Sequence, residues 1–140
     1  MAARTIITSS AEETIEAGRT LARTLTPPLL IFLSGELGAG KTTLAKGIIS
    51  GLGAAREEDV TSPTFTLVHE FRGPVRVFHI DLYRIEGPAQ FSSLGLDDVF
   101  AQPAIVLVEW PEKWHLPVDW PVVRITLATL DDERHEIRLS

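Results

Sequence analysis

A glycine-rich segment, GELGAGKT at residues 35–42, most constrains what this chain can fold into. The apolar run LLIFLS precedes it, and residues 41–52 repeat apolar side chains at helical spacing. An apolar run without alternation is typical of a strand that is buried on both faces. The segment is therefore predicted to turn the chain from a central strand, Leu29–Ser34, into a helix.

The same segment matches the P-loop pattern G-x-x-x-x-G-K-[ST] without a mismatch. Its glycines allow successive backbone N–H groups to point inward around phosphate oxygens, where a Cβ would obstruct them. Lys41 supplies a positive charge for the β and γ phosphates, and the Thr42 hydroxyl is placed to bind Mg²⁺. The alternative, a glycine-rich turn with a surface lysine, is disfavoured because a strand and a helix flank the segment as a P-loop requires.

A P-loop needs a second carboxylate for the metal, usually at the end of a neighbouring apolar strand. Glu109 directly follows the apolar run AIVLV, where a charge is costly unless it faces a cleft. Asp81, within VFHIDLYR, is the other candidate, and its alternative role is to pair with Arg84 or His79. The alternative for Glu109 is a solvated strand terminus. The residues favour Glu109 but leave both carboxylates as candidates.

The rest of the chain predicts further strands and helices around the P-loop. Ser9 or Ser10, with a glutamate three residues on, is a capping-box signal for a helix expected to stop at Thr26, before two prolines. Strands are expected in TLVHEF, VRVFHIDLYRI, AIVLV, VVRITLATL and HEIRLS, and short helices in GPAQFSSLGLDDVF. The pattern predicts a P-loop NTPase-like α/β fold, with a mostly parallel central sheet flanked by helices and an antiparallel C-terminal hairpin. It is expected to form one domain over residues 1–140.

Composition excludes several classes of protein. The formal net charge is -6, whereas a chain that grips phosphate backbones over a broad surface needs an excess of Lys and Arg. The chain has no cysteine, which excludes disulfides and thiolate metal sites. Its apolar runs are too short to cross a bilayer, and its first residues carry no signal-like apolar segment. A cytoplasmic protein without membrane contact is expected.

The expected nucleotide is ATP, because guanine-specific switch proteins usually read their base through Asn-Lys-x-Asp and this sequence contains no asparagine. Two function classes stay open, a hydrolytic ATPase switch and a P-loop kinase that phosphorylates a small metabolite. The switch is favoured because the arginines are scattered and no segment is free to form a lid. Thr64, within SPTFT, is then the candidate that senses the γ-phosphate and Mg²⁺. The alternative for SPTFT is a proline-rigidified turn before a strand.

Tryptophan and histidine side chains add one further candidate. Of the three tryptophans, only Trp110 is a functional candidate, because it adjoins Glu109. The four histidines show no metal-ligand spacing and are interpreted as structural.

The motifs SGELGAGKTTLAKGI, SPTFTLVHEF, HIDLYRI, LGLDDVF and VEWPEK occur in this order in one short chain. In order and spacing they resemble the TsaE family, the P-loop ATPases of bacterial tRNA threonylcarbamoyladenosine biosynthesis. The resemblance covers residues 29–113 well and the two ends loosely. It implies an ATPase of low intrinsic activity, stimulated by the partner proteins TsaB and TsaD. The complex would support attachment of a threonylcarbamoyl group to the adenosine 3′ of the anticodon in tRNAs that read codons starting with A, with the tRNA held mainly by the partners.

The resemblance also implies roles by position. Thr42 and Glu109 would bind Mg²⁺, and Asp81 would orient water or the metal shell. The adenine would lie between residues 10–14, Ala11 included, and Arg134. The residues that would wrap the phosphates are Gly38, Ala39, Gly40, Lys41, Thr42 and Thr43. The expected catalytic residues are Lys41, Thr64, Asp81 and Glu109. One departure from the family is Glu36, where aspartate is common, and another is PAQFSSLGL, where an acidic helix is commoner.

Overall fold

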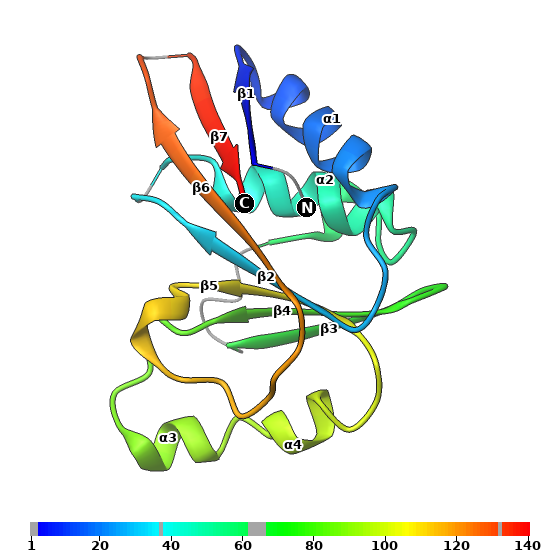
Figure 1. The fold of residues 1–140 in the computed structure, drawn as a ribbon, viewed down its shortest axis with the longest axis vertical. Coiled ribbons are helices and arrows are strands. Elements are labelled where there is room, and N and C mark those ends of the chain that lie inside the picture. Colours follow the sequence, from blue (N-terminus) through cyan, green and yellow to red (C-terminus); the bar gives the residue numbers. More distant parts are fainter. Residues whose placement is uncertain (1–2, 37, 62–66, 132) are drawn as a thin grey trace.

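The computed structural model describes residues 3–36, 38–61, 67–131 and 133–140. Within these ranges, one seven-stranded sheet has the order β1-β7-β6-β2-β5-β4-β3 (Figure 1). The strands are β1 (Arg4–Thr8), β2 (Leu29–Ser34), β3 (Val68–Arg72), β4 (Arg76–Asp81), β5 (Ile105–Glu109), β6 (Val122–Thr129) and β7 (His135–Leu139). The helices are α1 (Ala11–Ala22), α2 (Lys41–Gly51), α3 (Pro88–Ser92) and α4 (Leu96–Val99), with short 3-10 turns at Glu57–Asp59 and Pro111–Lys113. In the ranges described, no helix combines the length and apolar character needed to span a bilayer.

The centre of the sheet is parallel and both edges are antiparallel. Strand β2 pairs in parallel with β5 and β6, and β4 pairs in parallel with β5. Strand β7 pairs antiparallel with β6 and β1, and β3 pairs antiparallel with β4. The predicted α/β class, the mostly parallel centre and the C-terminal hairpin are confirmed.

Strand β2 is apolar on both pleat faces because helices cover both sides of the sheet centre. Ile31 and Leu33 belong to a core cluster that includes residues of α1 and α2. Leu30 belongs to a second cluster, which includes residues of α4 and the loop after it. Figure 1 shows α1 and α2 on one side of the central strands and α3 and α4 on the other. This double cover explains why an unalternating apolar run correctly predicted the strand Leu29–Ser34.

Helix α1 begins as predicted but ends earlier. The Ser10 side chain accepts a hydrogen bond from Glu13 N at 3.1 Å, and Ser9 N donates to Glu13 Oε1 at 2.9 Å. The expected end at Thr26 is wrong, since the helix ends at Ala22. After it, Thr24 N and the Thr24 hydroxyl both donate to the Leu21 carbonyl oxygen, at 2.9 and 2.8 Å, so a tighter turn closes the helix end.

Glycines allow α1 and α2 to pack in direct backbone contact. A Cβ at Gly18 would lie 2.7 Å from the Leu44 carbonyl oxygen, and one at Gly47 would overlap the Ile15 carbonyl oxygen. The α1–α2 contact therefore tolerates no side chain at these positions. It fixes the helix that follows the glycine loop against the N-terminal helix.

Replacing Gly47 with alanine is expected to destabilise the fold by about 3 kcal/mol, at the upper end of the range for overpacked cores. The added methyl group meets backbone of α1, which cannot move without separating the two helices. Gly87→Ala is the matched control, because a Cβ there has no atom within 4 Å. Urea unfolding of both variants measures the difference. Equal stability of the two would contradict the close packing of α1 on α2.

Candidate functional site

The predicted P-loop joins the end of β2 to the start of α2. Gly38 has φ +82° and Gly40 has φ +98°, a left-handed conformation that side chains with a Cβ rarely adopt. Gly35 packs against β6, since a Cβ there would lie 2.6 Å from the Leu127 carbonyl oxygen. Ala39 is buried, and its N–H donates to the Glu36 carbonyl oxygen at 3.0 Å. The loop thus packs against β6 at Gly35 and is open at Gly38, where a Cβ would meet no atom within 4 Å.

Lys41 opens α2 and its amino group folds back over the loop. Its Nζ donates to the Gly35 carbonyl oxygen at 2.5 Å and lies 4.3 Å from the centroid of the Trp110 ring. Only 6% of Lys41 is exposed. Thr42 and Thr43 follow in the first helical turn and are half-buried. The charged amino group of Lys41 therefore lies inside the loop, where phosphate oxygens are expected.

The two candidate carboxylates lie side by side. Asp81 is the last residue of β4 and Glu109 the last of β5, and the parallel pairing places them directly opposite each other. Leu33 of β2 pairs with Glu109 on the other side, just before the P-loop begins. Both carboxylates are buried, with 7% of Asp81 and 4% of Glu109 exposed. The structure thus brings Lys41, Asp81 and Glu109 to the carboxyl ends of the parallel strands, where α/β proteins bind ligands.

The two carboxylates have different partners. The Nε2 atom of His79 lies 2.7 Å from Glu109 Oε2, whereas Asp81 Oδ1 accepts a hydrogen bond from Tyr83 N at 2.9 Å. The sequence left open a pairing of Asp81 with His79. In the structure, His79 pairs with Glu109 instead. Sequence reasoning missed His79 as a site residue. The available signal was its position two residues before Asp81, which places both on one face of β4.

The pKa of the Asp81 carboxyl is raised above its ordinary value, chiefly by burial and further by the neighbouring Glu109. The hydrogen bond from Tyr83 N and the nearby His79 and Lys41 act in the opposite direction. A carboxyl with a raised pKa in the folded protein destabilises that state once it is ionised. Asp81 is therefore expected to cost stability at neutral pH, as polar groups in functional sites often do.

Asp81→Asn is expected to raise the melting temperature of the ligand-free protein at pH 7, because it removes the buried charge. The gain should shrink as the pH falls towards about 4, because Asp81 becomes protonated in both states near its unfolded pKa. Calorimetric melting at several pH values measures it. Asp131→Asn is the control of opposite sign, because the bond to Arg134 lowers the pKa of the exposed Asp131 carboxyl. A wild type that is more stable than Asp81→Asn at pH 7 would contradict the argument.

The Trp110 ring, which packs on Lys41, contacts a second aromatic ring, that of Tyr83. The Trp110 ring lies 4.8 Å from the Tyr83 ring, centroid to centroid, and Lys113 Nζ lies 5.2 Å from the Tyr83 centroid. Trp110 has φ +59°, a left-handed conformation that turns the chain sharply after Glu109. The structure thus places Trp110, the one tryptophan interpreted as functional, against the P-loop lysine. Tyr83, which is 45% exposed, was missed by sequence reasoning.

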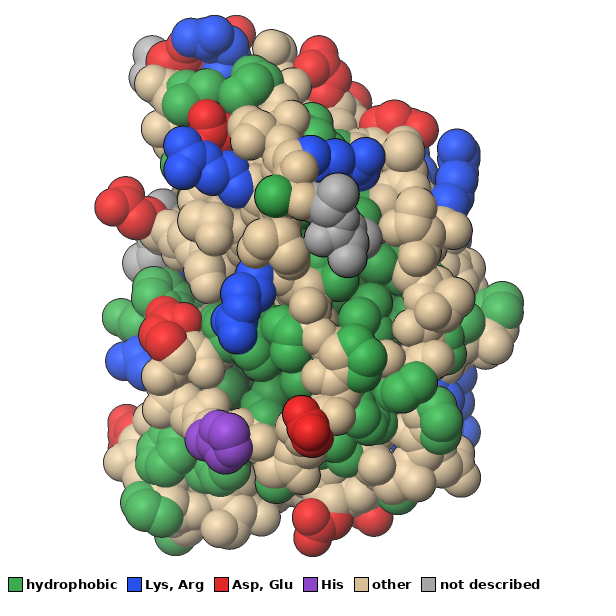
Figure 2. Space-filling view, viewed as in Figure 1, with side chains coloured by type: hydrophobic (Ala, Val, Ile, Leu, Met, Phe, Trp, Pro, Cys, Tyr) green, Lys and Arg blue, Asp and Glu red, His purple; other side chains and the backbone are tan. Residues whose placement is uncertain are grey.

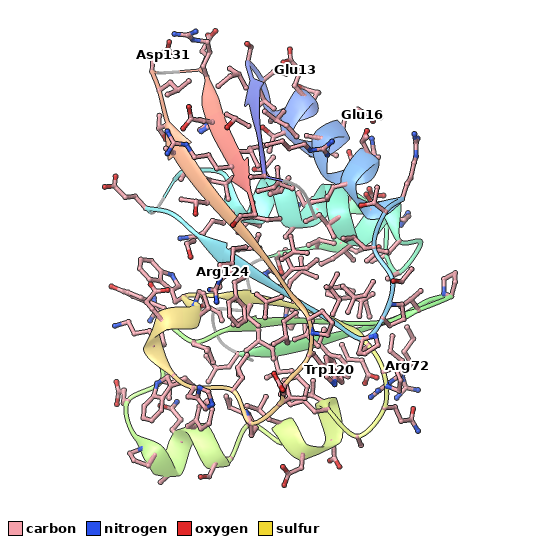
Figure 3. The ribbon with its side chains drawn as sticks, in the orientation of Figure 1. Glu13, Glu16, Arg72, Trp120, Arg124 and Asp131 are labelled. Carbon is pink, nitrogen blue, oxygen red and sulfur yellow. The ribbon has the colours of Figure 1, made fainter. Side chains whose placement is uncertain are left out.

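The expected adenine region lies beyond the end of β6. A pocket of about 460 Å³ is lined by Ser9, Asp131, Glu133 and Arg134. Figure 3 shows Asp131 at the tip of the β6–β7 hairpin, near the end of α1 that carries Glu13. Arg134 Nε donates to Asp131 Oδ2 at 2.7 Å. The structure thus brings Arg134 to the N-terminal segment, although Ala11, exposed at the start of α1, is not among the residues that line this pocket.

Thr64 lies outside the described residues, so its assignment to a switch loop stays a prediction.

A larger and more apolar hollow of about 630 Å³ is lined by Leu29 and Pro121, among others, at the other end of β2 from the P-loop.

The described residues fit a magnesium-bound nucleotide. In the described part of the chain, no group of three or more His, Cys, Asp or Glu residues is arranged for a metal. Mg²⁺, however, usually binds through one or two carboxylates together with water and phosphate. The bond from His79 engages one oxygen of Glu109, Oε2, and Lys41 is held by a carbonyl oxygen whose place a phosphate oxygen can take. Glu109 thus keeps a second oxygen for a metal, Thr42 lies in the first turn of α2, and their role as metal ligands stays a prediction.

A glycine loop between a central parallel strand and a helix, with carboxylates at the neighbouring strand ends, defines a P-loop NTPase-like α/β protein. The family model described as threonylcarbamoyl adenosine biosynthesis protein TsaE matches residues 8–137. The chain belongs to the TsaE family.

Individual relatives agree with this assignment. The tRNA threonylcarbamoyladenosine biosynthesis protein TsaE of Treponema pallidum is 32% identical over 134 residues, which cover 96% of this chain and 98% of the relative. The protein of the same name from Bacillus subtilis is 36% identical over 134 residues, which cover 95% of this chain and 82% of the relative. The crystal structure of Bacillus subtilis YdiB superposes with a TM-score of 0.74 at 30% identity, covering 99% of this chain and 84% of YdiB.

Proposed function

We propose that this chain binds and hydrolyses Mg-ATP in tRNA threonylcarbamoyladenosine biosynthesis, acting with partner proteins TsaB and TsaD. The observation that carries the proposal is the meeting of Lys41, Asp81 and Glu109 beside the glycine loop, in a member of the TsaE family. Low intrinsic hydrolysis, stimulated by the partners, is the expected behaviour. The metabolite-kinase alternative is disfavoured because the relatives are proteins of tRNA modification.

The residues have distinct roles in this proposal. Residues 38–43 hold the phosphates through backbone N–H groups and the start of α2. Lys41 exchanges its carbonyl partner for the β and γ phosphates, and Thr42 and Glu109 hold the metal. Bound Mg²⁺ neutralises charge on the phosphates. Asp81, fixed by Tyr83 N, orients the attacking water.

The surface supports a role in which partners hold the tRNA. Figure 2 shows Lys and Arg side chains interspersed with Asp and Glu on one face of the molecule, without a continuous basic patch. The net charge of -6 also opposes contact with a phosphate backbone over a wide area. ATP turnover by this chain would then act on the protein complex, and the tRNA would be reached indirectly.

The test measures ATP turnover with and without Mg²⁺ and with and without TsaB and TsaD. Wild type is expected to release phosphate only with Mg²⁺ and faster with the partners. Thr42→Ala should lose most of this activity, because it removes a hydroxyl from the metal site, whereas Thr20→Ala, exposed on α1, should not. Full activity of Thr42→Ala would remove Thr42 from the site. Transfer of phosphate to a metabolite, one for each ATP, would instead support the kinase.

A further inference from the structure

A fully buried histidine lies beneath the candidate metal carboxylate. His79 is 0% exposed, and its Nε2 atom lies 2.7 Å from Glu109 Oε2. Glu109 is itself 4% exposed, so the contact is shielded from water. A carboxylate that binds a metal only accepts hydrogen bonds, so this contact fits Nε2 as the donor.

The second ring nitrogen of His79, Nδ1, makes a histidine at this buried position unfavourable for stability. Nδ1 of His79 is buried, and no described residue provides it with a hydrogen-bond partner. In the β4–β5 pairing, His79 lies opposite the buried Leu107. An apolar side chain would pack there without leaving a buried polar atom unsatisfied. The one polar contact that the ring makes in the described structure is the bond to Glu109, so any benefit of the histidine acts through that carboxylate.

We propose that His79 is a positioning residue that holds one oxygen of Glu109, so that the other oxygen is presented to Mg²⁺. The inference rests on the proposed function, because it assumes that Glu109 binds the metal. Carboxylates that bind metals are commonly oriented by hydrogen bonds from a second layer of side chains, and loss of such a partner weakens metal binding by about 10- to 100-fold. His79 thereby prepares the site before nucleotide arrives.

The chain offers two informative variants and a matched control. His79→Gln keeps an N–H donor at about the reach of Nε2, whereas His79→Phe keeps a ring and removes the donor. His69 is the control, since it lies directly opposite His79 in the β3–β4 pairing and its ring stands perpendicular to the Phe71 ring, 6.1 Å between centroids. His69→Phe makes the same chemical change on the adjacent strand.

The experiment titrates ATP by calorimetry at a series of Mg²⁺ concentrations and also in EDTA. His79→Phe should require at least about tenfold more Mg²⁺ for half-maximal strengthening of ATP binding. Its affinity for ATP in EDTA should stay within about twofold of wild type, because the P-loop is untouched. His79→Gln should recover most of the Mg²⁺ response, and His69→Phe should match wild type. An unchanged Mg²⁺ requirement in His79→Phe, or equal losses with and without Mg²⁺, would overturn the inference.

The titration separates this inference from the proposed function. If wild type binds ATP no better with Mg²⁺ than without, the metal role of the site fails, and the positioning role with it. If wild type responds to Mg²⁺ and Glu109→Gln does not, the metal site is supported and the remaining comparisons test His79 alone. In the Glu109→Gln background, His79→Phe should then have little further effect on Mg²⁺, as expected for residues that act as one unit.

A measurement on the unaltered chain tests the proposal directly and uses a variant only to assign one signal. Histidine labelled with ¹⁵N reports the proton on each ring nitrogen, and the His79 signal is the one lost in His79→Gln. Nε2 of His79 should be protonated, and its signal should shift when Mg²⁺ is added to the ATP complex but not when ATP is added in EDTA. An unprotonated Nε2, or no response to Mg²⁺, would contradict the proposal.

Discussion

Replacing Lys41 with alanine is expected to weaken ATP binding by about ten- to a hundredfold, since hydrogen bonds to charged groups contribute about 1.5–3 kcal/mol. In the free protein its amino group is buried against the Gly35 carbonyl oxygen and the Trp110 ring. Because the group is already in place, phosphate binding orders no extra side chain. The same charge serves the ground state and the transition state, so the loss should appear in affinity and in kcat/KM together.

Lys46→Ala is the matched control for this prediction. Lys46 lies on the same helix, but its amino group donates to the carbonyl oxygens of Val60 and Glu57, at 2.6 and 3.1 Å. Both variants remove one positive charge from α2, so a general change in charge affects them equally. Calorimetric titration with ATP should show a large loss only for Lys41→Ala. Unchanged ATP binding in Lys41→Ala, or equal losses in the two variants, would remove Lys41 from the phosphate site.

Sequence reasoning succeeded where structure is local. The strand Leu29–Ser34, the capping of α1 by Ser10 and the strand that ends at Glu109 follow from runs of a few residues and from caps. Each depends on hydrophobic periodicity or on a hydrogen bond between residues close in the chain. The order of layers then follows, because parallel strands joined by helices must be covered on both faces.

Sequence reasoning failed where structure depends on distant pairing. Strand β1 was not predicted, because Arg4–Thr8 is stabilised by pairing with Leu139 and its neighbours at the other end of the chain. The close contact of α1 and α2 at Gly47 was also missed. A glycine within a helix gives no indication of which helix packs against it.

The candidate site was predicted in part for the same reason. The position of Glu109 at the end of a strand was predicted, since functional groups gather at the carboxyl ends of parallel strands. Asp81 was placed inside a longer strand, VRVFHIDLYRI, whereas β4 ends at Asp81. That His79 bonds to Glu109 could not be derived, because it depends on the register between β4 and β5. A shift of one residue would have turned His79 to the opposite face. Binding of ATP and Mg²⁺ by these residues remains a prediction.

Glu109→Gln and Asp81→Asn are expected to damage activity in different ways. Each change removes a charge and keeps the shape of the side chain. The amide oxygen that Glu109→Gln introduces can still accept the bond from His79, and the one that Asp81→Asn introduces can still accept the bond from Tyr83 N. The local structure should therefore survive in both variants. Glu112→Gln, exposed in the turn after Glu109, is the control for loss of one negative charge.

If Glu109 binds the metal, Glu109→Gln should abolish the strengthening of ATP binding by Mg²⁺, because the metal joins the phosphates before any chemistry begins. If Asp81 orients water, Asp81→Asn should still bind Mg-ATP, while single-turnover hydrolysis slows by about 10²–10⁴-fold. ATP titrations with and without Mg²⁺ and single-turnover assays distinguish the two, and both variants should fail to support tRNA modification in cells. Should Asp81→Asn lose the Mg²⁺ dependence of binding while Glu109→Gln keeps it, the two roles are reversed. The bond from His79 would then hold the water-orienting carboxylate instead of the metal ligand.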